Sequence, residues 1–210
     1  MNKIKMLALA SVAGFAAMPA GATTTMYTDS AAFLAASGGA VLNDLNGATV
    51  GEDVLAGSYP GVTISGTGTT AYFVDGTSGY AVNGTTYLDV DISGGSITAV
   101  FGAPLKAFGA SFFSLNNNLA RTTITIDGTV FDPLPLSPSF LGFVSDTGFT
   151  SITFTNPLAY PDNDHFGVDD IYVSLAAPAV PEPATWGMMV AGLGIVGFAM
   201  RARKAAVRFA

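Results

Sequence analysis

Carboxylates are the residues through which this chain could do chemistry. The chain holds 15 Asp and Glu, and all of them except Glu182 lie between Thr23 and Ala179. Only Lys106 and Arg121 are basic in that range, because the other basic residues lie near the two ends. Such an acidic body suits calcium, whose ligands are oxygens, or sugars, or simple solubility. It excludes nucleic-acid binding through phosphates, which needs a basic patch.

Two pairs of carboxylates have the spacing Asp-x-Asp. They are Asp89 with Asp91, and Asp162 with Asp164. We interpret both pairs as solvated carboxylates on a turn or on the face of a strand. The alternative is that one of these pairs forms a cation site, because calcium is bound by several carboxylate oxygens at once.

The sequence contains no convincing enzyme motif. His165 is the only histidine, so a three-histidine zinc site cannot form. A Ser–His–Asp triad would need His165, but no Gly-x-Ser-x-Gly elbow occurs. There is no cysteine, which removes disulfides, thiolate ligands and thiol nucleophiles. The run Gly66–Ala71 superficially fits a dinucleotide loop, but no helix follows, so it predicts a turn. We expect a protein that is not an enzyme, with His165 in a loop.

Aromatic and amide side chains are the candidates for ligand binding. Sugar sites on β-sandwiches combine aromatic platforms with Asp, Asn and Gln side chains. The only tryptophan is Trp186, near the C-terminus, so a platform in the body must consist of Tyr or Phe. The candidates are Tyr59, Tyr72, Tyr80, Tyr87, Tyr160 and Asn117. The alternative is that most of these rings pack in the core or on strand faces.

Short β-strands must position these side chains. Gly, Thr, Ser, Asn and Asp separate runs of β-branched and aromatic residues throughout the body. The runs are Val62–Ser65, Thr70–Val74, Thr86–Asp91, Ser96–Phe101, Ala107–Phe113, Thr122–Ile126, Thr129–Phe131, Phe140–Ser145, Ser151–Thr155 and Asp170–Leu175. Polar and apolar residues alternate in Thr122–Asp127, as in a half-buried strand. Asp127-Gly128 between two such runs predicts a hairpin.

The strand pattern predicts an all-β, antiparallel β-sandwich of the jelly-roll type. Turn signals recur about every ten residues, which is typical of sandwiches and barrels. One helix is expected early, over Asp29–Ser37. Asp29 or Ser30 is its predicted N-cap, and Gly38-Gly39 is expected to end it.

Both ends of the chain differ from the body, which occupies residues 23–176. Residues 1–22 join two lysines, an apolar stretch and Ala20-Gly21-Ala22, the pattern of a cleaved signal peptide. Residues 177–185 form a Pro-rich linker, and residues 186–200 carry no charge and predict a single transmembrane helix. The basic tail, residues 201–210, is expected to stay in the cytoplasm, which places the body outside.

The tail resembles that of the PEP-CTERM family of exported bacterial proteins. The matching residues are Pro181, Glu182, Pro183, Trp186, Arg201, Arg203 and Lys204. The tryptophan resembles that of the PEPxxWA variant, with Gly187 in place of Ala. The resemblance implies recognition and cleavage by a membrane-embedded exosortase, in a host that makes exopolysaccharide. The same tail is also labelled an ice-binding protein C-terminal domain, which is no evidence of ice binding.

The body is similar to carbohydrate-binding-module jelly rolls found before such tails. The matching runs are Leu42–Leu45, Tyr59–Ser65, Leu141–Phe154 and His165–Ser174. The resemblance implies that the first and last strands lie side by side, often bridged by a structural calcium ion. Its ligands here would be Asn43, Asp44, Asp169 and Asp170. Adjacent carboxylates repel each other unless a cation or hydrogen bonds intervene; the alternative is that one caps a turn and the other faces water.

These patterns together predict an exported protein that is transiently anchored in the inner membrane. It then reaches the cell surface or the extracellular space, where its body binds glycan or exopolysaccharide. One alternative is a structural surface or biofilm protein with no small ligand. Another is a hydrolase using Asp169, Asp170 and His165. Ice binding would need threonines at a fixed repeat, which the sequence lacks.

Overall fold

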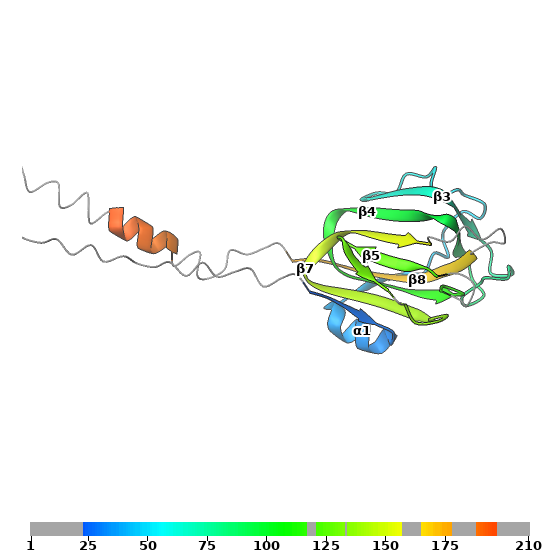
Figure 1. Cartoon of the computed structure of the whole chain (residues 1–210), viewed down its shortest axis with the longest axis horizontal. Coiled ribbons are helices and arrows are strands. Elements are labelled where there is room, and N and C mark those ends of the chain that lie inside the picture. Colours follow the sequence, from blue (N-terminus) through cyan, green and yellow to red (C-terminus); the bar gives the residue numbers. More distant parts are fainter. Residues whose placement is uncertain (1–22, 117–120, 133, 157–164, 178–187, 197–210) are drawn as a thin grey trace, which may run out of the picture. The chain divides into compact units, whose positions relative to one another are not determined.

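The computed structural model describes residues 23–116, 121–132, 134–156, 165–177 and 188–196 (Figure 1). The chain divides into two units, Met1–Leu175 and Ala176–Ala210. The elements of the first unit are β1 (Thr24–Tyr27), α1 (Ser30–Ser37), β2 (Val41–Asn43), β3 (Val62–Val74), β4 (Tyr87–Phe113), β5 (Thr123–Ile126), β6 (Thr129–Phe131), β7 (Phe140–Thr155) and β8 (His165–Leu175). Every strand pair is antiparallel, which confirms a mostly β, antiparallel body.

The sheet has the strand order β2-β8-β4-β7-β5-β6, with β1 on β7 and β3 on β4. It folds over into two layers, and β4 and β7 curve from one layer to the other (Figure 1). Residues 87–101 of β4 pair with β3, and residues 105–113 pair with β7 and β8. Within the first stretch, residues 88–91 also pair with β8 and residues 96–100 also pair with β7. β2, which overlaps the Leu42–Leu45 run, lies beside the last strand, β8, whereas the first strand, β1, pairs with β7.

Several predicted strands are parts of longer ones. β3 and β7 each join two predicted runs, and β4 joins three. The prediction of a turn at Gly66–Ala71 is wrong, because these residues lie within β3 and only shift its register between Thr67 and Thr69. Glycines inside a strand often mark a bulge rather than an end. Gly66 and Gly68 therefore do not end the strand, contrary to the prediction.

Helix α1 begins as its sequence predicts. The Asp29 side chain accepts a hydrogen bond from the backbone N–H of Ala32 at 2.8 Å, and Gly38 ends the helix with a φ of 74°. Phe33 is fully buried, with its ring centroid 5.4 Å from that of Phe140. A Cβ at Gly142 would overlap the Phe33 ring, so this glycine lets α1 approach β7 closely.

The hairpin between β5 and β6 is confirmed. Asp127 and Gly128 both have positive φ values, 42° and 85°, as a tight primed turn requires. The Asp127 carboxylate also accepts hydrogen bonds from the backbone N–H groups of Thr150 and Ser151, at 3.0 and 2.9 Å. The hairpin tip is thereby joined to β7.

The main core fills the space between the two layers and sets which side chains face outward. Val90 and Ile92 of β4 are buried in it. Because side chains alternate along a strand, Asp89 and Asp91 face the opposite side. They lie on the face of a strand, as expected, but they are less solvated than expected, because only 21% of the Asp89 side chain and 23% of the Asp91 side chain are exposed. Asp162 and Asp164 lie outside the described residues.

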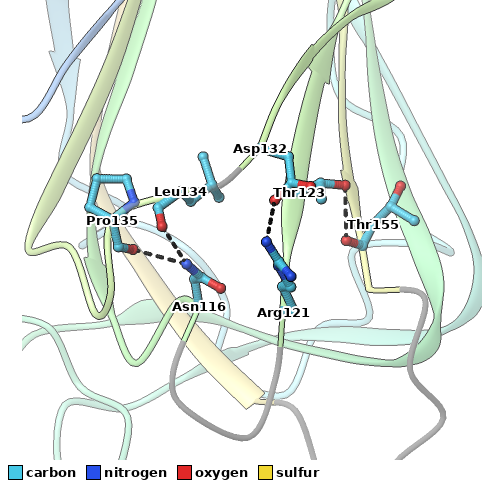
Figure 2. A network of polar contacts seen from close by, with 7 residues as sticks. All are labelled: Asn116, Arg121, Thr123, Asp132, Leu134, Pro135 and Thr155. Atoms are coloured by element: carbon cyan, nitrogen blue, oxygen red, sulfur yellow. Dashed lines mark hydrogen bonds and ion pairs between the residues drawn. The ribbon is translucent and has the colours of Figure 1, made fainter.

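Polar contacts join the segment after β4 to the segment after β6 (Figure 2). The Asn116 amide donates to the backbone carbonyls of Leu134 and Pro135, at 2.7 and 3.1 Å. Nearby, Arg121 lies 3.5 Å from the carboxylate of Asp132. Asn116 is buried and has a φ of 52°. We assign it a structural role, because its amide is engaged by two buried carbonyls.

The second unit contains a helix over residues 188–196. No helix in the described part of the chain is long and apolar enough to cross a membrane. The predicted signal peptide (residues 1–22), most of the linker and part of the predicted membrane helix lie outside the described residues. The same holds for the predicted sorting residues, Pro181, Glu182, Pro183, Trp186, Arg201, Arg203 and Lys204.

Candidate functional site

Strand pairing aligns five residues across the outer face of the body. Asp53 bridges to Tyr72 of β3, Tyr72 lies opposite Asp89 of β4, Asp89 opposite Gly167 of β8, and Gly167 opposite Phe113. We call Asp53, Tyr72, Asp89, Gly167 and Phe113 the aromatic row. The two aromatic residues of the row are exposed: 40% of Tyr72 and 46% of Phe113 are accessible to solvent.

His165 lies beside this row and is held by two carboxylates. Its Nδ1 is 3.1 Å from Asp89 Oδ1, and its Nε2 is 3.6 Å from Asp91 Oδ2. The expectation that His165 lies in a loop is wrong, because it is the first residue of β8 and lies opposite Asp91. Since both ring nitrogens face carboxylates, the imidazole acts as a cross-strand connection between β4 and β8.

Tyr80 extends the aromatic surface. Its ring stacks on His165 with centroids 5.4 Å apart and packs edge-on against Phe113 at 6.2 Å. A Cβ at Gly167 would overlap the Tyr80 carbonyl oxygen, so the glycine allows the segment containing Tyr80 to lie directly on β8. Tyr80 thus joins His165 and the aromatic row into one surface.

Of the other candidates in the sequence, Tyr87 does not belong to this surface. Tyr87 is fully buried, and burial, followed by the charge of Asp89, raises the pKa of its phenol. The prediction of Tyr87 as a ligand-contacting residue is therefore wrong. Asn117 and Tyr160 lie outside the described residues. Tyr72 and Tyr80 are the two predicted residues that the structure brings together.

Two residues of the site, Asp53 and Phe113, were not predicted from the sequence. The connection that His165 makes between β8 and β4 was not predicted either. Phe113 could have been found from strand alternation, because Phe112 is buried and its neighbour must face outward. Asp53 could not, because it lies in an irregular segment that pairs with the edge of β3. Its neighbour Val54 donates its backbone N–H to the Ala71 carbonyl at 2.9 Å.

The predicted calcium ligands gather where β2 meets β8. Asp169 is fully buried and accepts hydrogen bonds from Thr85 Oγ1 at 3.0 Å and from the backbone N–H of Asp170 at 2.8 Å. Burial raises the pKa of its carboxyl most, and the charges of Asp170 and Asp44 raise it further, against those hydrogen bonds. Hydrogen bonds thus relieve part of the repulsion expected between adjacent carboxylates.

The other three predicted calcium ligands, Asn43, Asp44 and Asp170, each accept a hydrogen bond from a nearby residue. Asn43 Oδ1 accepts the backbone N–H of Leu45 at 3.2 Å, and Asp170 accepts a hydrogen bond from Asn83 at 3.4 Å. Asp44 is exposed, and its Oδ1 accepts from the backbone N–H of Asn46. Among the described residues, no group of three or more His, Cys, Asp and Glu side chains is arranged to hold a metal ion. Calcium at these residues stays a prediction.

Comparison with known proteins identifies the tail. Residues 179–204 match the PEP-CTERM protein-sorting motif. A signal of this kind implies that the chain is exported and anchored in a membrane before cleavage. No curated protein matches the chain. Among solved structures, the chain is similar to the family 11 carbohydrate-binding module of the cellulosomal cellulase Lic26A-Cel5E of Clostridium thermocellum. The identity is 14%, the coverage 67% of this chain and 98% of that one, and the TM-score 0.33.

Proposed function

We propose that the body binds a glycan on the outer face of β3, β4 and β8. The observation that carries this proposal is the aromatic row, in which exposed rings of Tyr72 and Phe113 flank the carboxylate of Asp89. The faces of such rings accept the apolar faces of sugars, and carboxylates accept hydrogen bonds from sugar hydroxyls. The chemistry needed for sugar recognition therefore lies on one surface.

The geometry of the row favours a particular kind of glycan. Tyr72 and Phe113 are three strand positions apart, which corresponds to about 14 Å at roughly 4.8 Å per strand. An oligosaccharide or polysaccharide can contact both rings, whereas a single sugar cannot. Asp53, Asp89 and Asp91 give this surface negative charge, which repels acidic polysaccharides. We therefore favour a neutral extracellular polysaccharide.

The sorting signal supports binding outside the cell. We propose that the tail is of the PEPxxWA variant, that a membrane-embedded exosortase cleaves it near Pro181–Pro183, and that the body reaches the cell surface or the extracellular matrix. A Pro-Glu-Pro segment resists helix formation, which keeps it accessible to an enzyme at the membrane face. The retained anchor would be needed only until cleavage.

We also propose that the body is not an enzyme. His165 has a carboxylate next to each ring nitrogen, and Asp169 is buried, so neither side chain is presented to a substrate. The predicted calcium ion would be held by Asp44, Asp169 and Asp170 with Asn43. There it would neutralise carboxylates that lie between β2 and β8 and so stabilise the fold.

Affinity electrophoresis through gels containing neutral polysaccharides tests the glycan proposal. Tyr72→Ala and Phe113→Ala should each weaken binding by about 1–2 kcal/mol, or roughly 5- to 30-fold, as for aromatic anchors at other interfaces. Val130→Ala is the matched control, because Val130 is 60% exposed on β6, away from the row. If no polysaccharide, neutral or acidic, retards the wild-type chain, the proposal is wrong and a purely structural protein is favoured. Equal weakening by all three variants also contradicts it.

A further inference from the structure

A cavity of about 320 Å³ lies inside the body, between its two layers. Its wall consists of inward-facing apolar side chains from β3, β4, β7 and β8, completed by the segment between β2 and β3. Within the described part of the chain, Asn43 and Tyr59 are the only polar residues that line it. Because no charged side chain is among the lining residues, this space differs in chemistry from the acidic outer face.

The inner faces of the sheet are incompletely closed around this cavity. Ile64 on β3, Phe101 on β4 and Val173 on β8 all line it and remain only partly buried. Asn43 also lines the cavity and is exposed at the end of β2. The cavity is therefore an apolar chamber with an opening rather than a sealed packing defect.

Water is a poor occupant of this chamber. A buried water molecule needs about two to four polar partners. The Tyr59 hydroxyl already donates to Glu52 Oε1 at 2.9 Å, and Asn43 Oδ1 accepts the Leu45 N–H at 3.2 Å. Burial and the neighbouring Glu52 raise the pKa of Tyr59 to about 12, so this phenol stays neutral. Voids much larger than a water molecule are rare in protein interiors, because their walls lose contacts.

We propose that this cavity binds the acyl chain of a lipid or fatty acid. The volume lies at the lower end of the roughly 300–1,000 Å³ typical of small-molecule sites. The acyl chain packs against the inner faces of β3, β4 and β8. Its polar end remains at the opening beside Asn43, because the interior offers no charged partner.

This site is independent of the glycan-binding surface. Along β4, Ala99 lines the cavity, and the next residue, Val100, is 44% exposed on the opposite face. The residues of the aromatic row that lie on β3 and β4, Tyr72, Asp89 and Phe113, likewise face away from the core. Either proposal can therefore fail while the other holds.

The experiment measures binding of N-phenyl-1-naphthylamine, a probe that fluoresces in apolar surroundings, to the delipidated full-length chain, with lauric acid as competitor. Ala99→Phe places a ring inside the cavity, and Val100→Phe places the same ring on the outer face of the same strand. Val173→Phe narrows the cavity from the opposite layer, in case Ala99→Phe fails to fold. Circular dichroism and thermal unfolding establish that each variant is folded.

We expect wild type and Val100→Phe to bind one equivalent of probe saturably and to release it to lauric acid. Ala99→Phe and Val173→Phe should bind about tenfold more weakly or worse, because they exclude methylene groups from the cavity. Lauric acid should raise the melting temperature of wild type but not of Ala99→Phe. If wild type binds no probe saturably, as when the chain's own apolar segment fills the cavity, the proposal is overturned. Equal affinity of all four proteins overturns it as well.

Discussion

The imidazole Nδ1 of His165 lies 3.1 Å from Oδ1 of Asp89, a residue 76 positions earlier in the chain. This contact joins β8 to β4, and Tyr80 stacks on the face of the same imidazole. The position of Tyr80 therefore depends on strands that lie beneath it. Any change that lifts Tyr80 from β8 should also disturb the aromatic row, because Tyr80 packs against Phe113.

Gly167→Ala tests how closely the segment containing Tyr80 lies on β8. The added Cβ would overlap the Tyr80 carbonyl oxygen, so the segment must move. We expect the free energy of unfolding to fall by about 1–3 kcal/mol, as for other overpacked sites, and glycan binding to weaken. Gly79→Ala is the matched control, since a Cβ there meets nothing within 4 Å. Urea unfolding and affinity electrophoresis measure the two effects, and equal behaviour of both variants would show that the close approach is unimportant.

The raised pKa of Asp169 predicts a dependence of stability on pH. Because folding favours the protonated carboxyl, its stabilising contribution is complete below the ordinary pKa of 3.8 and is lost as the pH rises through the higher folded-state value. Asp169→Asn carries no charge and cannot lose a proton. In EDTA, the variant should therefore gain stability relative to wild type between pH 3 and pH 7. Urea unfolding at several pH values measures this difference, and a constant difference would contradict the assignment.

Calcium should make wild type more stable than Asp169→Asn, because calcium binds the ionised carboxylate. If Asp44, Asp169 and Asp170 hold the ion, calcium at about 100 times its dissociation constant adds about 2.7 kcal/mol to the free energy of unfolding. Thermal unfolding in calcium and in EDTA measures this gain, which Asp169→Asn should abolish. Asp146→Asn is the control, because Asp146 is exposed at the turn of β7. Melting curves that coincide in calcium and EDTA would rule the site out.

The fold could be predicted from local signals wherever a single pattern decided the conformation. Asp29 and Gly38 at the ends of α1, and Asp127-Gly128 at the hairpin, each require a specific backbone geometry, and the structure has it. The lengths of β3 and β4 could not be predicted in this way. Gly94 has a φ of 66° yet lies within β4, because pairing with neighbouring strands continues the strand through the bend.

The candidate site was less predictable than the fold. Tyr72 and Tyr80 were identified as aromatic residues of an acidic body, but so was Tyr87, which is buried. Local sequence cannot separate these tyrosines, because register across three strands decides which of them share a face. The cavity was not predicted at all, since the residues that line it read as ordinary core positions.

Asn116 provides a test of the polar network in Figure 2. Asn116→Ala removes two amide donors from buried carbonyls and places alanine at a φ of 52°. We expect a loss of about 2–3 kcal/mol in the free energy of unfolding, from unsatisfied carbonyls and an unfavourable backbone. Asn116→Gly tolerates the backbone and should lose roughly 1 kcal/mol less. Urea unfolding compares them, and equal losses would mean that the positive φ contributes nothing.

Cleavage of the tail can be measured directly as the mass of the mature protein from its native host. The match of residues 179–204 to the sorting motif predicts that the protein outside the membrane lacks the tail beyond about Pro181–Thr185 and lacks residues 1–22. Exchanging Pro181 and Glu182 for alanine together should leave the full tail on the chain and hold it in the membrane. Pro178→Ala is the matched control, because it changes a proline of the same linker just outside the matched residues. A wild-type protein that keeps its tail would make the membrane anchor permanent, and the glycan-binding face would then act at the inner membrane instead of in the extracellular matrix.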